Sequence, residues 1–236
     1  MSLLNKTLSL ILKFVYDTVS TFGNEPEKIS YYAIAIILTS IIFKLLMLPL
    51  SFKQTTSTEK MQEIQPKMAK IQEKYKNDSQ TMQLKMQELY KEHNYNPASG
   101  CFVSLIQLPV AIAFFGVFKN PTAYAFSDPM MYETMNKAFL WIPSLENPDP
   151  YLWGLPLIAA FTTYLQSKTM MIGTLEGSGQ ENSTQNILNY MMPIMIFFSA
   201  KGFPAGLALY WVINNSFTII QQLISKRDYL QRNRYD

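Results

Sequence analysis

Apolar residues are gathered in long blocks along the chain, and these blocks predict helices that cross a membrane. The first block, at 29–52, holds about the twenty residues that a bilayer requires. Each later block contains or follows a proline, which membrane helices tolerate better than soluble ones do. We therefore expect five transmembrane helices, at 29–52, 101–119, 151–171, 187–200 and 205–224.

The fourth of these blocks, 187–200, is short, with 14 residues. As a helix it would be roughly 21 Å long, against about 30 Å for the hydrocarbon core of a bilayer. A short span can be accommodated by thinning of the bilayer around it. We therefore expect the membrane to be thin near this helix.

Segment 1–28 precedes the first block and has its apolar residues on one face of a predicted helix. They recur at intervals of three and four residues, at Leu4, Leu8, Ile11, Val15, Val19 and Phe22. The polar residues Asn5, Ser9, Lys13 and Asp17 fall on the other side. A cleaved signal peptide would need an uninterrupted apolar core, which Lys13 breaks. We expect an N-terminal amphipathic helix that lies in the membrane interface.

Segment 53–95 is polar and charged, and its sparse apolar residues form two heptad-like stripes on either side of 76–78. Such stripes predict two helices that pair outside the membrane as a helical hairpin. Pro66 should kink the first arm, because proline lacks the N–H that a helix needs. Methionine is a flexible side chain, and four of them lie in the stripes: Met61, Met68, Met82 and Met86.

Composition and charge support the same class of protein and indicate an orientation. Hydrophobic residues make up 48% of the chain and charged residues 16%, against roughly 25% charged in soluble domains. With the hairpin inside the cell, 13 of the 20 Lys and Arg residues lie inside, 6 outside and one within a span. The positive-inside rule then favours an external N-terminus, an external loop at 120–150, a cytoplasmic loop at 172–186 and a short basic cytoplasmic tail at 225–236.

Lys44 is the one charged residue within a predicted span core. At the bilayer centre it would cost about 2.5–3.5 kcal/mol. It lies six residues before Leu50, so its side chain could snorkel to the inner surface. The alternative is a polar cavity within the helix bundle.

Polar residues in four of the predicted spans favour the cavity over snorkelling. They are Ser40, Gln107, Gln166, Tyr210, Trp211, Asn214, Asn215 and Thr218. Any one of them could instead serve ordinary hydrogen bonding between helices. No acidic residue lies in a span core, so the sequence offers Lys44 no carboxylate partner there.

The sequence contains no recognisable catalytic arrangement. The single histidine, His93, lies in the charged hairpin segment, and Cys101 is the only cysteine. There is no HExxH motif, glycine-rich phosphate loop or pair of metal-ligand motifs. We expect no enzymatic activity, no cofactor and no metal site.

Five stretches together resemble the YidC family of membrane protein insertases. They are FKLLMLPLSFKQ, EIQPKMAKIQEKY, NPASGCFVSLIQLPV, WIPSLENPDPY and FPAGLALYWVINNSFTIIQQ. The resemblance covers 29–222, in order and with the same number of spans. It implies an all-α integral membrane protein with five spans and a cytoplasmic hairpin. It also implies a water-filled groove in the inner half of the bilayer, open to the cytoplasm and to lipid.

The resemblance also implies roles for individual residues. The groove of the family carries one positive charge, usually an arginine, at the position of Lys44. Ser40, Gln166, Tyr210 and Trp211 match groove-lining positions. A lysine keeps the charge but loses the two-pronged geometry of arginine. The chain lacks the large external domain of Gram-negative relatives, and its short tail does not favour strong ribosome tethering.

The expected function is that of an insertase and chaperone of the bacterial cell membrane that uses no nucleotide. A nascent hydrophobic segment would contact the hairpin first, at Met61, Pro66, Met68, Met82 and Met86. Its acidic flank would then enter the groove, drawn by Lys44. Expected partners are nascent membrane proteins and the lipid bilayer, with the ribosome and the Sec translocon as further candidates and no specific nucleic acid.

Two alternatives belong to other functional classes. One is a small-solute transporter or channel with Lys44 as an anion site. Transporters usually show two related halves, and this chain shows no such repeat. The other is a structural assembly factor, which would bind membrane proteins without inserting them.

Overall fold

The computed structural model describes residues 2–96, 109–126, 128–171 and 190–232. Within these ranges the regular structure is helical, apart from isolated bridges between single residues, which confirms the all-α prediction. Residues 109–119 are helical. The other helices are α1 (Ser2–Ser20), α2 (Tyr31–Leu46), α3 (Leu48–Lys74), α4 (Ser79–Glu92), α6 (Pro121–Tyr124), α7 (Pro129–Thr134), α8 (Leu155–Met171), α10 (Met192–Gly202) and α11 (Ala205–Arg232).

The structure gives no independent support for the predicted membrane spans. Across the described ranges, no helix is both long enough and apolar enough to qualify as one. The number, boundaries and orientation of the spans therefore remain predictions. Parts of the predicted spans, at 101–108 and 187–189, and the whole predicted loop at 172–186 lie outside the described residues.

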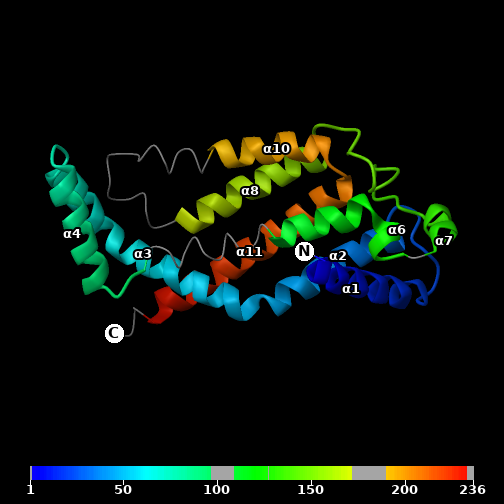
Figure 1. Ribbon diagram of the computed structural model, residues 1–236, viewed down its shortest axis with the longest axis horizontal. Helices are drawn as coiled ribbons and strands as arrows, with labels where there is room; N and C mark the ends of the chain where they lie inside the picture. The colour runs from blue at the N-terminus through cyan, green and yellow to red at the C-terminus, as the bar shows by residue number, and fades with distance from the viewer. Residues whose placement is uncertain (1, 97–108, 127, 172–189, 233–236) are drawn as a thin grey trace.

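The molecule is elongated, with α4 at one end and the short helices α6 and α7 at the other, and α3 runs from the middle of the molecule out to α4 (Figure 1). Between these ends lie α2, α8, α10, α11 and the helix at 109–119. Helix α8 packs against both α10 and α11, and α11 also packs against α2. Helix α1 packs against α2. Helix α11 is therefore the element that α2 and α8 share.

The predicted segment 29–52 contains α2 and the first residues of α3, with a break at Met47. Ser30 caps the start of α2 by accepting a hydrogen bond from the Ala33 N–H at 3.1 Å. Pro49 lies in the first turn of α3, where its missing N–H costs no intrahelical hydrogen bond. Pro66, by contrast, lies inside α3, and the helix continues on both sides of it.

Helix α1 packs into the core alongside α2, and its polar face is more buried than its spacing predicts. Leu8 and Val15 lie in the core as expected. Ser9, predicted on the polar side, is only 2% exposed, and Asn5 approaches Gly116 of the helix at 109–119. Phe22, predicted on the apolar face, is exposed. The cause is that α1 contacts α2, α6 and the helix at 109–119, so more than one face is covered.

Helices α3 and α4 form an antiparallel pair with a small apolar seam. Ile64 and Met68 of α3 are buried with Leu89 of α4. Asp78 begins α4 by accepting hydrogen bonds from the Thr81 N–H at 3.0 Å and its hydroxyl at 2.6 Å. These bonds hold the pKa of the Asp78 carboxyl below its ordinary value.

The predicted contact residues of this pair do not all lie in the seam. Met68 is buried, and Met61 and Met86 are partly buried against it. Met82 is partly exposed, and Pro66 is exposed. The α3–α4 pair therefore turns some of its methionine surface outward.

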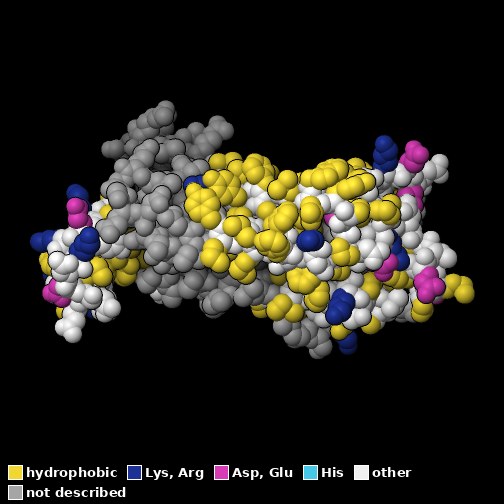
Figure 2. Space-filling model, turned by 90° about the horizontal axis from the view of Figure 1, so that it is seen from above, with side chains coloured by type: hydrophobic (Ala, Val, Ile, Leu, Met, Phe, Trp, Pro, Cys, Tyr) yellow, Lys and Arg dark blue, Asp and Glu magenta, His cyan; other side chains and the backbone are white. Residues whose placement is uncertain are grey.

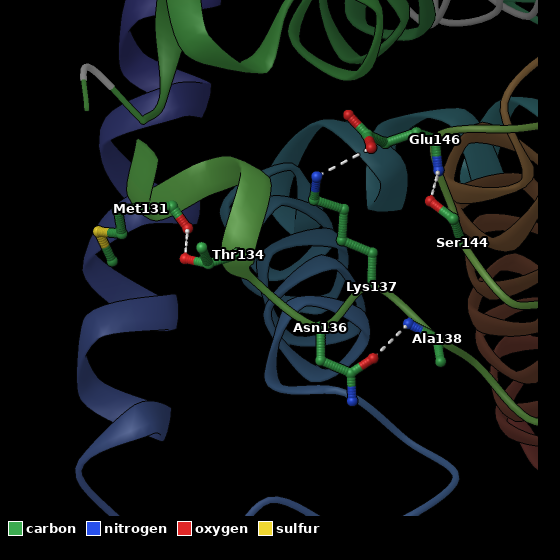
Figure 3. Close-up of polar contacts among 7 residues, drawn as sticks. All are labelled: Met131, Thr134, Asn136, Lys137, Ala138, Ser144 and Glu146. Carbon is green, nitrogen blue, oxygen red and sulfur yellow. Dashed lines mark hydrogen bonds and ion pairs between the residues drawn. The ribbon is translucent and has the colours of Figure 1, made fainter. Parts of the chain in front are cut away.

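Side-chain contacts stabilise the long segment that precedes α8, as Figure 3 shows for residues 131–146. The Lys137 ammonium pairs with the Glu146 carboxylate at 2.9 Å, and both groups are partly buried. The same ammonium lies 3.7 Å from the ring centre of Tyr132, which stacks on Phe126. Burial raises the pKa of the Tyr132 hydroxyl well above its ordinary value. This segment is therefore an ordered part of the fold.

Candidate functional site

Polar side chains occupy two different faces of α11. Asn214, Thr218 and Gln221 are spaced by four and three residues, which puts them on one face of the helix. Asn215 and Gln222 are seven residues apart and share a neighbouring face. The first face includes the contact with α2, and the second includes the contacts with α8.

Lys44 of α2 contacts the first face of α11. Its ammonium donates a hydrogen bond to the Thr218 hydroxyl at 3.0 Å, and that hydroxyl donates to the Asn214 carbonyl at 2.8 Å. A hydroxyl has one donor and two acceptor positions, so both bonds can form at once. The salt bridges found within the described residues do not include Lys44, so its charge is held by a neutral oxygen.

Asn215 connects the second face of α11 to α8. Its side-chain amide donates to the Thr163 hydroxyl at 2.8 Å and to the Thr162 hydroxyl at 3.2 Å. Asn215 and Thr163 are both buried. Further along, the Thr169 hydroxyl donates to the Gln222 carbonyl oxygen at 2.5 Å. These contacts form a polar seam between α8 and α11.

Ser40 and Tyr210 are close to this region in the sequence, but their side chains are engaged elsewhere. The Ser40 hydroxyl donates to the Ile36 carbonyl of its own helix at 2.7 Å and is buried. The Tyr210 ring is buried and stacks on Phe114 at a centroid distance of 4.0 Å. Ser40 thus bonds its own helix, and the Tyr210 ring packs in the core.

The remaining predicted site residues are less constrained. Trp211 is partly buried, with its ring 6.2 Å from that of Phe203. Gln166 is partly exposed on α8. Gln107 lies outside the described residues. We call the Lys44–Thr218 contact and the α8–α11 seam, which lie on neighbouring faces of α11, the polar strip.

Thr162, Thr163 and Thr169, which supply the α8 side of the polar strip, are not among the residues predicted from the sequence. A signal was present, since Thr162, Gln166 and Thr169 are spaced by four and three residues within an apolar block. Threonines are easily overlooked there, because a hydroxyl in a membrane-type helix often bonds its own backbone. The Thr163 hydroxyl bonds its own backbone and another helix at once: it donates to the Ala159 carbonyl at 2.7 Å and accepts from the Asn215 amide.

Helices α8 and α10 carry many exposed apolar side chains. Figure 2 shows hydrophobic side chains over the middle of the molecule, with most charged side chains toward the ends. Exposed large hydrophobic residues of α8 and α10 include Leu157, Phe161, Ile194, Met195 and Phe198. Many exposed apolar side chains on one face are typical of contact with lipid or with other proteins.

Comparison with known proteins adds independent information. The family described as "60Kd inner membrane protein" matches residues 26–232. A protein of Listeria monocytogenes named "Membrane protein insertase YidC 1" is 40% identical over 197 residues, covering 82% of this chain and 63% of the relative. "Membrane protein insertase MisCA" of Bacillus subtilis is 38% identical over 206 residues, covering 86% and 73%.

A third relative matches over almost its full length. "Membrane protein insertase YidC" of Fusobacterium nucleatum is 34% identical over 223 residues, covering 94% of this chain and 96% of the relative. The Listeria relative is matched over only 63% of its length. Helix α1, at Ser2–Ser20, lies before the residues that match the family.

Proposed function

This chain belongs to the YidC family of membrane protein insertases, in its short Gram-positive type, and we propose that it inserts hydrophobic segments of nascent proteins into the bacterial cell membrane. The proposal needs neither nucleotide nor covalent chemistry. The observation that carries it is the contact of Lys44 with the neutral Thr218 hydroxyl, in a bundle whose helices α8 and α10 expose large apolar side chains. A cation held in this way is suited to attract the acidic segment of a substrate that binds transiently.

The first step is electrostatic attraction of a polar or acidic flank to Lys44. Two unit charges 4 Å apart attract by about 4 kcal/mol at an effective dielectric constant of 20, before desolvation is subtracted. A lysine ammonium has three N–H donors, and the bond to Thr218 uses one of them. The others are suited to a carboxylate or a backbone carbonyl of the substrate.

The second step is transfer of the apolar segment into lipid. The exposed hydrophobic residues of α8 and α10 support a path along this side, because the segment would exchange one apolar surface for another. Helix α10 has 11 residues, or roughly 16 Å of helix, and a thin membrane beside it would shorten the distance that a polar tail crosses. Attraction and thinning lower the barrier, and the apolar segment itself supplies the driving force.

In the proposed arrangement, five spans cross the membrane with the N-terminus outside and the α3–α4 pair in the cytoplasm. Lys44 then lies near the cytoplasmic end of the bundle, and the polar strip lines a hydrated groove. The partly exposed methionines of the α3–α4 pair make the first contact with the substrate. Nascent membrane proteins and lipid are the partners, and the ribosome and the Sec translocon are further candidate partners.

The experiment is insertion of a single-span substrate into liposomes that contain the purified protein. The proposal predicts protease-protected substrate in these vesicles and none in protein-free vesicles. Substrate that binds to the protein but stays protease-sensitive contradicts the proposal and indicates an assembly factor. Flux of small anions without insertion contradicts it too and indicates a transporter or channel.

A further inference from the structure

The segment 137–149, which we call the clasp, contacts the first turns of three helices. At α2, the Ser30 N–H donates to the Ala138 carbonyl at 3.0 Å. At α11, the Ala205 N–H donates to the Asn147 carbonyl at 2.8 Å, and the Gly206 N–H donates to the Leu145 carbonyl at 2.9 Å. Helix N-termini have free N–H groups, so these bonds satisfy them and join two helices to one segment. The third helix, α8, is held by Asp149.

Asp149 is only 7% exposed and accepts hydrogen bonds from several directions. Its Oδ2 accepts from the Leu155 N–H, the first residue of α8, at 2.7 Å. Its Oδ1 accepts from the Tyr151 N–H at 2.9 Å, and the Trp141 indole N–H lies 3.2 Å from both oxygens. A buried carboxylate at a helix N-terminus is also stabilised by the helix dipole. Asp149 therefore joins the start of α8 to the clasp.

Gly154 gives this carboxylate the space that it occupies. A Cβ atom added at Gly154 would overlap the Asp149 carboxylate. Gly202 at the end of α10 has no neighbouring atom within 4 Å of its corresponding position. The close approach at Gly154 is therefore specific to the Asp149 contact.

The clasp holds the N-terminal ends of α2, α8 and α11 together. The three helices therefore run in the same direction, with a fixed register relative to one another. Lys44 lies 13 residues after Tyr31, and its partner Thr218 lies 13 residues after Ala205. One residue of slip would move a side chain by about 1.5 Å along the axis and about 100° around it. The hydrogen bonds of the polar strip would not survive such a slip.

We propose that Asp149 is a positioning residue that sets the register of α8 against α11, and so assembles the polar strip. Its effect reaches Thr163, which lies eight residues, or about 12 Å, along α8 from Leu155. Asp149 itself touches no substrate. The link to insertion rests on the proposed function, whereas the link to helix register does not.

The register is measured by disulfide formation between Thr163→Cys and Asn215→Cys in a Cys101→Ser background. We expect Asp149→Ala and Gly154→Ala to slow oxidation of this pair several-fold. The matched controls are Asp128→Ala and Gly202→Ala, because Asp128 caps only the short helix α7 and Gly202 has open space. Oxidation at the same rate in the Asp149 and control variants, at equal amounts of folded protein, overturns the proposal.

The consequence for function is measured with two single-span substrates, one with an acidic tail and one with a neutral tail. We expect Asp149→Ala to lower insertion of the acidic substrate toward the level of Lys44→Gln and to leave the neutral one unchanged. A general folding defect would lower both. Loss of the disulfide with undiminished insertion of the acidic substrate overturns the functional half of the proposal. If Lys44→Gln itself has no effect, the proposed function fails, while the disulfide measurement still decides the role of Asp149.

Discussion

Lys44 and Thr218 link a charge on α2 to the backbone of α11. The Thr218 hydroxyl accepts from the ammonium at 3.0 Å and donates to the Asn214 carbonyl at 2.8 Å, one helical turn earlier. The hydroxyl is thereby oriented with a lone pair toward Lys44. A lysine side chain has many rotamers, and this contact favours one in which the ammonium faces α11.

The first prediction concerns the coupling between these two residues. In a double-mutant cycle of Lys44→Met and Thr218→Val, we expect a coupling free energy of about 0.5–2 kcal/mol, the range of interhelical hydrogen bonds in membrane bundles. The measurement is unfolding of the purified protein in detergent. The control is a second cycle in which Thr18→Val replaces Thr218→Val, because the Thr18 hydroxyl donates to the Phe14 carbonyl of its own helix. Additive effects of Lys44→Met and Thr218→Val would contradict the contact.

The second prediction concerns the seam between α8 and α11. We expect Asn215→Leu to lower the free energy of unfolding by about 1–3 kcal/mol, because it removes a buried hydrogen bond to Thr163 and a partly buried one to Thr162. Asn120→Leu makes the same change at an exposed position whose side chain caps no helix. Equal effects of the two substitutions would show that the seam adds nothing to stability.

The third prediction concerns the α3–α4 pair. Leu89 is 6% exposed in the seam, whereas Leu84 on the same helix is 60% exposed. We expect Leu89→Ala to weaken the pair by about 2–3 kcal/mol and Leu84→Ala to change it little. Hydrogen exchange at the amides of α4 reports the difference. Similar protection in both variants would mean that the pair is not held by its apolar seam.

The fourth prediction concerns the path of the substrate. A photoreactive amino acid at Gln166 or Trp211 should crosslink to a stalled nascent chain, because both positions are partly exposed near the polar strip. The same probe at Tyr124 in α6, toward the other end of the molecule, should give little product. Equal crosslinking at all three positions would contradict a defined path.

The sequence predicts the helical class and the paired arms at α3 and α4 because both follow from repeated local spacing. It also predicts the shared face of Asn214 and Thr218. The contacts of Asp149 could not be predicted, because its partners come from the loop that contains it and from the first residue of α8. Nor could the burial of Ser9 be predicted, since a helical pattern shows one apolar face and says nothing about a second neighbour.

The candidate site shows the same division. Lys44 stands out in the sequence because a charge within an apolar block is rare. Its partner is only one of several polar residues on α11, and the choice of Thr218 depends on the relative register of two helices. Tyr210 matches a pattern in the sequence, yet its ring lies in the core against Phe114. Periodicity identifies faces, and packing decides what each face contacts.

The central claim is that a positive charge at position 44 drives insertion of segments with acidic flanks. Its most direct test compares Lys44→Gln with Lys44→Arg for a single-span substrate with an acidic external tail, in cells that depend on this protein as their insertase. We predict that Lys44→Arg keeps insertion, and that Lys44→Gln lowers it about tenfold, as expected if roughly a third of the 4 kcal/mol attraction survives desolvation. Unchanged insertion with Lys44→Gln, or loss with Lys44→Arg but not with Lys44→Gln, would contradict the account.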